Sequence, residues 1–411
     1  MTPRALEGAL RRALAEMSPS DRVTAALSAR PPRARSAGGK VSVIAIGKAA
    51  PEMAAGALRR WHEHVADVLV VTSDGTDAGA IIGDERVEVL RASHPVPDRR
   101  SVEAGKRCLD LARARSRDGG LLLVLVSGGA SALVCAPAKG VRLADKQAVT
   151  RAMLASGASI QDINVIRKHL SRIKGGGLAR AASPAPVITL VMSDVIRGAI
   201  DDVGSGPSVG DRSTIARARG LLRRYVPALA GLPLVTTGSA SNVVRARIIA
   251  SPEDLARRFA RMLREKGLRV RVLEPSHDAV VDLAQAYIDL AKRLRPGTAI
   301  VRAAEPSLEV PRARARTGRG GRSTHLAALV GLGLPRGTSF LAAATDGVDG
   351  TSGTAGALVV GDTLRARVSE AVIVRALDRY DTGPLHRAAK TALERRPSGH
   401  NLADVHVLVR V

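Results

Sequence analysis

Four short segments of the sequence carry residue types that bind anions or metal ions, and each follows an apolar run. They are Gly47-Lys48, Ser127-Gly128-Gly129, Ser193-Asp194, and the stretch 346–350, which reads Asp-Gly-Val-Asp-Gly. Together they offer a cation, bare backbone amides and carboxylates. Because open α/β sheets bind ligands at the carboxyl ends of their strands, we expect these segments to follow strands and to surround a small ligand.

The Ser127-Gly128-Gly129 turn has two interpretations. Its backbone amides, at the start of a helix opened by Ala130 and Ser131, could hold phosphate, because a helix start carries unpaired donors and partial positive charge. Alternatively, it is a tight turn with Ser131 as the helix N-cap. The chain has no G-x-x-x-x-G-K-[ST] loop, and no G-x-G-x-x-G follows the first predicted strand, which disfavours nicotinamide binding.

The charged residues of the other segments also have two interpretations each. Lys48 directly follows an apolar run, so it is either a fixed positive charge facing a cleft or an ordinary surface lysine. Asp194, Asp346 and Asp349 are candidate Mg²⁺ ligands, because Mg²⁺ takes few carboxylates and leaves room for water and phosphate oxygens. The alternative for Asp346 and Asp349 is an Asp/Gly turn.

A dense basic segment, 163–179, contains three consecutive glycines that begin with Gly175 and follow its basic residues. On a helix, Arg167, Ser171 and Lys174 would share one face at i, i+4 and i+7. We expect that face to bind an anion. The alternative is a basic, solvated helix that ends at a glycine C-cap.

From residue 40 to about residue 238, apolar runs alternate with helical patterns, which predicts βαβ units and a parallel sheet covered on both faces; a second set of strands and helices starts near Gly267. The predicted strands are 40–47, 67–75, 87–98, 121–126, 185–195, 232–238, 268–275, 297–306, 338–347 and 404–411. We expect an N-terminal domain over 1–240, a boundary region over 241–290, and a C-terminal domain over 291–411.

Composition narrows the class of protein. With 411 residues, of which 45% are hydrophobic and 1% aromatic, the chain can form a large aliphatic core but lacks the rings on which nucleic-acid bases stack. Cys108 and Cys135 form no CxxC, and we find neither a signal peptide nor a membrane-spanning stretch, so we expect a cytoplasmic protein. The net charge of +25 raises nucleic acid as a partner, but apart from 311–316 the basic residues are scattered.

The sequence resembles the glycerate 2-kinases that carry a C-terminal MOFRL domain. Members of this family have an older name, hydroxypyruvate reductases. The resemblance runs from about residue 41 to the last residue. It rests on the following stretches: AIGKAA at 45–50, ASHPVPDRRSVEAG at 92–105, LVSGGASAL at 125–133, INVIRKHLSRIKGGGLA at 163–179, SDV at 193–195, SGPSVGD at 205–211, and TDGVDG with AGAL at 345–358.

The resemblance implies two α/β domains, the first Rossmann-like with a parallel sheet and the second of the MOFRL type, with the active site in the cleft between them. The implied reaction is ATP-dependent phosphorylation of D-glycerate at its 2-hydroxyl. The family's functional lysine and arginine match Lys48 and Arg322. Phosphoryl transfer relies mainly on positioning and charge stabilisation, which such residues can supply.

We therefore assign roles as hypotheses. Lys48, Arg167 and Arg322 would bind the substrate or the transferring phosphoryl group, and Asp194 would orient the hydroxyl or bind Mg²⁺ with Asp346 or Asp349. The nucleotide phosphates would contact the following residues: Ser127, Gly128, Gly129, Ala130, Ser131, Lys174 and Gly175. The expected partners are ATP and a small hydroxy acid, with no membrane, and the chain would be a monomer or homodimer.

The chain departs from the family pattern in three segments: 197–199, where Asp201 and Asp202 are displaced, 323–325, and 398–403. These departures leave open which hydroxy acid is the substrate. Other functions that stay open are a hydroxypyruvate reductase, a kinase for another 2-hydroxy acid, and a non-catalytic protein that binds anions or nucleic acid.

Overall fold

A computed structural model describes residues 1–32, 40–310, 318–396, 398, 399 and 401–411. The basic run 311–316, and His400 of the departing segment 398–403, lie outside the described residues. The backbone forms two compact units. The parallel-sheet unit comprises 18–193 and 198–249, and the mixed-sheet unit comprises 1–17, 194–197 and 250–411.

The first helix does not cluster with the sequence that follows it. Helix α1 (Pro3–Ala15) packs on α10 (Pro252–Glu265), and Glu16 pairs with both Arg258 and Arg261 of α10. These contacts place 1–17 in the mixed-sheet unit, whereas the sequence boundaries put it with 1–240. Domain boundaries drawn along the sequence assign each segment to its neighbours in the chain, so they miss a long-range contact of this kind.

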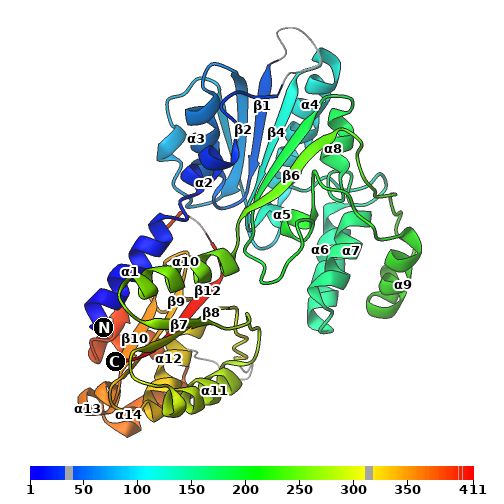
Figure 1. Cartoon of the computed structure of the whole chain (residues 1–411). Helices are drawn as coiled ribbons and strands as arrows, with labels where there is room; N and C mark the ends of the chain where they lie inside the picture. Colours follow the sequence, from blue (N-terminus) through cyan, green and yellow to red (C-terminus); the bar gives the residue numbers. More distant parts are fainter. Residues whose placement is uncertain (33–39, 311–317, 397, 400) are drawn as a thin grey trace. The chain divides into compact units, whose positions relative to one another are not determined.

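The parallel-sheet unit contains a six-stranded sheet in the order β3-β2-β1-β4-β5-β6 (Figure 1). The neighbours from β3 to β5 all pair in parallel. Strands β1, β4 and β5 are buried at every residue, as their unbroken aliphatic runs require. The strands are β1 (Val41–Ile46), β2 (Val65–Ser73), β3 (Val87–Ala92), β4 (Leu121–Val126), β5 (Val187–Met192) and β6 (Val243–Ala250).

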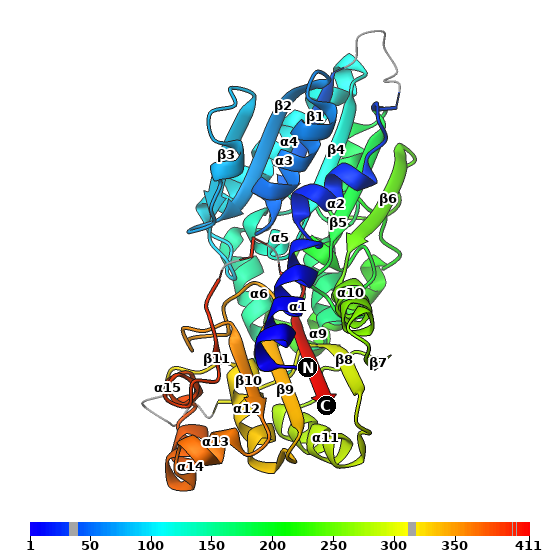
Figure 2. The ribbon, with the colours of Figure 1, turned by 60° about the vertical axis from the view of Figure 1, so that its left-hand side comes forward.

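Helices cover this sheet on both faces, with α3 between β1 and β2 and α4 between β3 and β4 (Figures 1 and 2). Helix α4 starts at a reciprocal cap between Asp98 and Ser101 and ends at Gly119 in the left-handed conformation. The helical segments of this unit are α2 (Pro19–Ala26), α3 (Ala50–Trp61), η1 (Gly79–Ile81), α4 (Arg99–Asp118), α5 (Ala130–Leu133), α6 (Leu143–Ala155), α7 (Ile160–His169), α8 (Gly177–Ala182), η2 (Val203–Ser205), α9 (Ile215–Tyr225) and η3 (Pro227–Leu229).

One strand predicted in this unit is wrong. Residues 232–238 form no strand, and Leu232, Leu234 and Val235 instead pack on a small aliphatic cluster beside α6, α7 and α9. The edge position is taken by β6, whose centre is exposed and carries Arg245 and Arg247. An apolar run therefore became a packed loop, while a more polar run formed the edge strand.

The mixed-sheet unit contains a second six-stranded sheet in the order β11-β10-β9-β12-β8-β7. Strands β7 and β8 pair in parallel, and the other described pairs of this sheet are antiparallel, so the unit is a mixed-sheet α/β domain, within the α/β class predicted for the C-terminal domain. The link 345–355 between β9 and β10 contains no helix. A parallel pair needs a long crossover connection, usually a helix, so these two strands pair antiparallel. The strands are β7 (Arg269–Val272), β8 (Thr298–Ala304), β9 (Thr338–Ala344), β10 (Gly356–Val360), β11 (Ala392–Leu393) and β12 (Asp404–Arg410).

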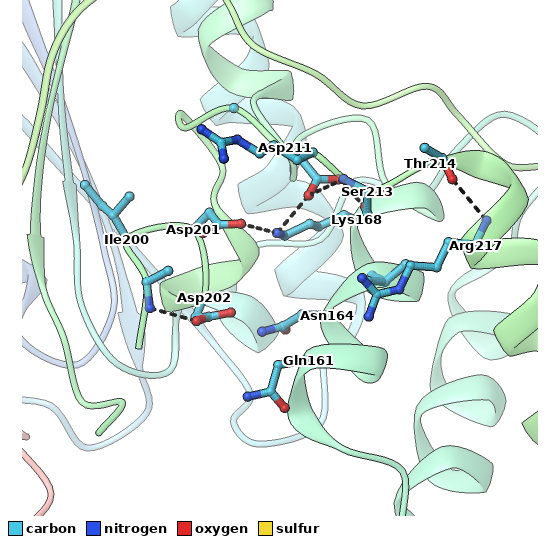
Figure 3. Close-up of a pocket in the computed structure, with 14 residues that line it drawn as sticks. Gln161, Asn164, Lys168, Ile200, Asp201, Asp202, Asp211, Ser213, Thr214 and Arg217 are labelled. Atoms are coloured by element: carbon cyan, nitrogen blue, oxygen red, sulfur yellow. Dashed lines mark hydrogen bonds and ion pairs between the residues drawn. The ribbon is translucent and has the colours of Figure 1, made fainter. Parts of the chain in front are cut away.

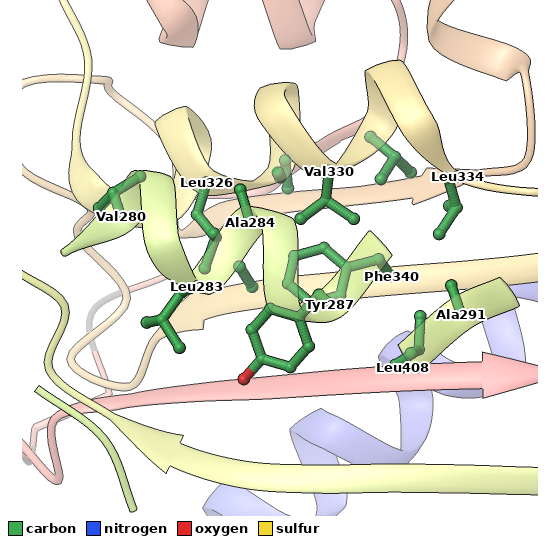
Figure 4. Close-up of a cluster of buried hydrophobic side chains, with 14 of the residues drawn as sticks. Val280, Leu283, Ala284, Tyr287, Ala291, Leu326, Val330, Leu334, Phe340 and Leu408 are labelled. Atoms are coloured by element: carbon green, nitrogen blue, oxygen red, sulfur yellow. The ribbon is translucent and has the colours of Figure 1, made fainter. Parts of the chain in front are cut away.

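The core of this unit lies between its sheet and helices α11 and α12 (Figure 4). Tyr287 and Phe340 meet with ring centroids 4.8 Å apart, and the Tyr287 hydroxyl lies 3.0 Å from Nδ1 of the buried His406. The remaining helices are α11 (Val280–Arg293), α12 (Arg322–Gly333), α13 (Thr363–Arg367), α14 (Glu370–Asp378) and α15 (Thr382–Ala388). Over the described residues, no helix has both the length and the hydropathy that crossing a membrane requires.

The carboxyl ends of β1 and β4 approach each other so closely that one residue between them must be glycine. Gly47 has a φ of +130°, and a Cβ there would lie 2.1 Å from the Ser127 Oγ and 2.7 Å from the Ser127 carbonyl oxygen. A side chain at this position would therefore force the two turns apart.

We expect Gly47→Ala to lower the free energy of unfolding by about 3 kcal/mol or more, because a left-handed residue costs ~1–2 kcal/mol and overpacking adds ~1–3 kcal/mol. The matched control is Gly75→Ala, which shares the positive φ, at +75°, but has nothing within 4 Å of the new methyl. Urea unfolding of both variants measures the difference. Equal losses would show that the close approach contributes nothing to stability.

Candidate active site

The structure brings Lys48 and the Ser127-Gly128-Gly129 turn together at the carboxyl end of the parallel sheet. The Lys48 amide donates to the Gly128 carbonyl at 2.9 Å, and the Ala49 amide donates to the Ser127 Oγ at 3.1 Å. The sequence placed these segments at strand ends, and β1 and β4 are neighbours in the sheet. Adjacent parallel strands end at the same edge, so the two turns must meet.

The turn presents backbone amides without protein partners. The amides of Gly128, Gly129 and Ser131 donate to no residue in the described part of the chain. Gly129, at a φ of +87°, is the N-cap of α5, and Ser131 lies inside the helix, so the alternative with Ser131 as N-cap is wrong. Helix α5 has only four residues, so the three amides, rather than a helix dipole, are the feature that can hold an anion.

Lys48 adds positive charge beside these amides. Its side chain is half-buried, and it forms no ion pair with any described residue. A Cβ on Gly129 would lie 3.5 Å from the Lys48 Cγ and 3.2 Å from a ring carbon of His94. Burial, and then the charge of Lys48, lower the pKa of His94. Sequence reasoning did not single out His94. Because its ring is neutral, the positive charge beside the turn comes from Lys48.

The basic segment 163–179 does not form the predicted helical face. Helix α7 ends at His169, so Ser171 and Lys174 lie beyond it. The solvated-helix alternative is wrong as well, because Lys168 and His169 are buried. Arg167 is half-buried, and its guanidinium has no hydrogen-bond or ion-pair partner among the described residues. Burial lowers the pKa of Arg167, as expected of a cation in this setting.

Lys174 is buried and holds the turn in place. Its Nζ donates to the Ser131 carbonyl at 2.9 Å, the Ser131 Oγ at 3.0 Å and the Gly204 carbonyl at 3.2 Å. Burial, followed by repulsion from Lys146 and Arg167, lowers the pKa of Lys174 well below its usual value. All the donors of the ammonium group are occupied, so Lys174 positions the turn rather than facing a ligand.

Gly175 has a similar structural role. Its amide donates to the Ser205 carbonyl at 3.1 Å, and its φ of +54° turns the chain toward η2. A Cβ there would lie 2.8 Å from the Thr237 Cγ2. The glycine therefore allows a close approach between chain segments.

Asp349 of the mixed-sheet unit serves as an anchor for α12. Its carboxylate accepts bonds from the Ser323 amide at 3.0 Å, from the Thr324 amide at 2.8 Å and from the Thr324 Oγ1 at 2.8 Å, and it is 1% exposed. These three donors occupy most of the acceptor sites of the carboxylate and commit it to the start of α12, so Asp349 does not fit a metal ligand.

The remaining candidate metal ligands give no assembled metal centre. Asp346 accepts the Val348 amide at 3.0 Å, which is the Asp/Gly turn of the alternative interpretation. Asp194 lies two residues after β5, is half-buried, and belongs to the short segment 194–197 of the mixed-sheet unit. No group of three or more His, Cys, Asp or Glu in the described ranges is arranged to hold a metal ion.

Arg322 is the first residue of α12 and is held by two carboxylates. Its Nε and Nη2 donate to Asp404 at 2.7 and 3.1 Å, and its Nη1 donates to Glu305 at 3.3 Å. Burial raises the pKa of Asp404 to about 7, against the opposing charge of Arg322. The arginine is about one-third exposed, so part of the guanidinium is open to a ligand while its orientation is fixed.

A cavity of about 570 Å³ opens in the parallel-sheet unit beside α7 (Figure 3). Lys168 reaches its wall and pairs with Asp201 at 2.6 Å and Asp211 at 3.1 Å. Sequence reasoning noted Asp201 only as a displaced carboxylate and did not consider Asp211. Only the fold brings these residues to one wall, because α7 and the loops after β5 meet there.

Comparison with known proteins agrees with the fold over nearly the whole chain. Residues 5–231 match a family described as a domain of unknown function (DUF4147), and residues 298–404 match the MOFRL family. The glycerate kinase crystal structure from Thermotoga maritima superposes with a TM-score of 0.85 at 27% identity, covering 99% of each chain.

Named relatives include the D-glycerate 2-kinase of Thermotoga maritima, 32% identical over 340 residues, with 79% of this chain and 80% of that protein covered. The glycerate 2-kinase of Pyrococcus horikoshii is 30% identical over 405 residues, with 90% of this chain and 87% of that protein covered. A protein of Agrobacterium vitis, provisionally named a hydroxypyruvate reductase, is 34% identical over 389 residues, with 90% and 99% covered. With both domain types present in order and the same fold throughout, this chain belongs to the glycerate 2-kinase family.

Proposed function

We propose that this protein is an ATP-dependent kinase that phosphorylates D-glycerate at its 2-hydroxyl. The observation that carries the proposal is the pairing of three unpartnered amides, from Gly128, Gly129 and Ser131, with Lys48, a cation that has no acidic partner in the described chain. Backbone donors next to an uncompensated cation are suited to phosphate. The identity of the reaction is inferred from membership of the glycerate 2-kinase family.

In the proposed reaction, the 2-hydroxyl oxygen of D-glycerate attacks the γ-phosphorus of ATP, the bond from that phosphorus to the β–γ bridging oxygen breaks to release ADP, and the hydroxyl proton is released to solvent. The amides of the turn would bind phosphate oxygens, and Lys48 would stabilise charge that develops on the transferring group. Removing one such stabilising group from an enzyme typically costs on the order of 10²–10³ in kcat.

The other residues would bind and orient the acid. Arg322, whose direction Asp404 and Glu305 fix, would bind the substrate carboxylate, with Arg167 as a further cation for the anionic ligands. Asp194 would accept the hydrogen bond of the reacting hydroxyl. Lys174 and Gly175 would act by holding the phosphate-binding turn in position.

Mg²⁺ would neutralise nucleotide phosphate charge when it is bound. Asp349 does not fit as its ligand, and Asp194 and Asp346 are too few to hold the ion without the nucleotide, so we assign no step to a protein-bound metal. The cytoplasmic location and the monomeric or homodimeric state stay predictions.

The first test is ATP consumption with D-glycerate and Mg²⁺, with the product passed to enolase in the absence of a mutase. A signal identifies 2-phosphoglycerate, because enolase acts on that isomer. The control reaction contains hydroxypyruvate and NADH without ATP. Loss of NADH there, with no ATP consumption in the first assay, would replace the kinase proposal with the reductase alternative.

Lys48→Met should lower kcat by about 10²–10³, because the methionine keeps the volume of the side chain but removes the stabilising charge. The matched control is Lys40→Met, which alters an exposed lysine immediately before the same strand. Steady-state kinetics and thermal unfolding should be measured for both variants. If the Lys48 variant is correctly folded and turns over like wild type, its proposed role is wrong.

The raised pKa of Asp404, about 7 against an unfolded value of about 3.9, sets a pH dependence of stability. The folded state binds the additional proton between these values. The contribution of Asp404 to the free energy of unfolding is therefore fully present below about pH 4 and is lost as the pH rises through 7. We expect the free energy of unfolding of wild type, relative to Asp404→Asn, to fall between pH 5 and 7 and then level off. A difference that instead grows with pH would mean that Arg322 keeps Asp404 ionised throughout.

A further inference from the structure

The cavity beside α7 is separate from the cation-and-amide turn and has a different chemical character. Its volume of about 570 Å³ falls within the range of sites for drug-sized ligands and far exceeds the needs of a three-carbon acid. It is lined by α7 and by the segments 199–202 and 210–217. All of these belong to the parallel-sheet unit.

Opposite charges balance across the cavity wall. Lys168 bridges Asp201 and Asp211, and Arg217 pairs with Asp162 at 3.3 Å. This wall does not concentrate positive charge, in contrast to the surroundings of Lys48. The cavity therefore suits the neutral, polar part of a ligand rather than a chain of phosphates.

Two side-chain amides, Gln161 and Asn164, project from one face of α7 toward Asp202 (Figure 3). Asn164 is 4% exposed, and its Oδ1 accepts the Ser205 hydroxyl at 3.0 Å, but its Nδ2 has no partner among the described residues. A side-chain amide pairs a donor with an acceptor, which complements the hydrogen-bonding edge of adenine. The Asp202 Oδ2 accepts the Ala199 amide, which leaves its other oxygen for a sugar hydroxyl.

A short chain of hydrogen bonds connects the cavity to the phosphate-binding turn. Asn164 bonds to Ser205, and the Ser205 Oγ lies 3.0 Å from the Ser131 Oγ. Ser131 carries one of the three unpartnered amides of the turn. The wall of the cavity and the turn therefore belong to one hydrogen-bond network of the parallel-sheet unit.

We propose that this cavity binds the adenosine part of the nucleotide, with Gln161 and Asn164 reading the base and Asp202 the ribose, so that the phosphates extend to the turn of Gly128 and Gly129. The inference rests on the proposed kinase function and places the whole nucleotide on the parallel-sheet unit. The exposed Arg212 lines the cavity, and its planar guanidinium can stack on the base. Aromatic rings, which often stack on bases, make up only 1% of this chain.

The first test compares Gln161→Ala with the matched control Gln285→Ala, an exposed helical glutamine of the mixed-sheet unit. Calorimetric titration should use two probes, ADP and inorganic tripolyphosphate. For Gln161→Ala we expect ADP binding about tenfold weaker, because the variant loses the hydrogen bonds between the amide and the base. Tripolyphosphate binding should not change, and the control should match wild type for both probes.

The second test needs no substitution. Photolabelling of the full chain with 8-azidoadenosine triphosphate, followed by peptide mapping, should place the label within 161–168 or 199–217, and ADP should suppress it. A label elsewhere, or unchanged ADP affinity in Gln161→Ala, overturns the inference.

The two proposals fail in distinguishable ways. If wild type phosphorylates glycerate but the label lies outside these segments, the kinase function stands and the adenosine site is wrong. If wild type neither binds ADP nor consumes ATP with glycerate, the proposed function fails, and the adenosine site fails with it.

Discussion

The turns after β1 and β4 are held together by two hydrogen bonds, from the Lys48 amide to Gly128 and from the Ala49 amide to Ser127. This contact uses backbone and hydroxyl groups, so it leaves the Lys48 ammonium uncommitted. It also fixes the conformation in which the amides of the β4 turn stay unpaired. The position of Lys48 and the unpaired amides of the turn therefore depend on one close approach, which Gly47 makes possible.

Two buried lysines of the same unit differ from Lys48 in that protein groups occupy their donors. Lys174 gives its donors to oxygens of Ser131 and Gly204, and Lys168 pairs with two aspartates. A buried ammonium group must be hydrogen-bonded or paired, or it costs several kcal/mol. These lysines meet that requirement within the protein, whereas Lys48 is half-buried and has no acidic partner among the described residues.

The mixed-sheet unit uses its carboxylates in the same structural way. Asp349 satisfies the first amides of α12, and that helix start carries Arg322, which Asp404 and Glu305 then orient. Two of the acidic residues that the sequence offered as metal ligands thus have structural roles: Asp349 caps a helix and Asp346 forms a turn. The position of a carboxylate beside glycines in the sequence does not indicate whether it will bind a metal ion, cap a helix or form a turn.

The sequence by itself determined the strands β1, β4 and β5 and the placement of Lys48 and Ser127 at their ends, because long aliphatic runs followed by glycine have few other structures. It also carried the family resemblance. Only the tertiary structure decided that β10 returns antiparallel to β9, that 232–238 packs as a loop while β6 forms the edge, and that Lys174 is enclosed. It also decided that Asn164, Asp202 and Asp211 line one cavity. Each of these outcomes depends on contacts between segments far apart in the chain, and local periodicity contains no information about them.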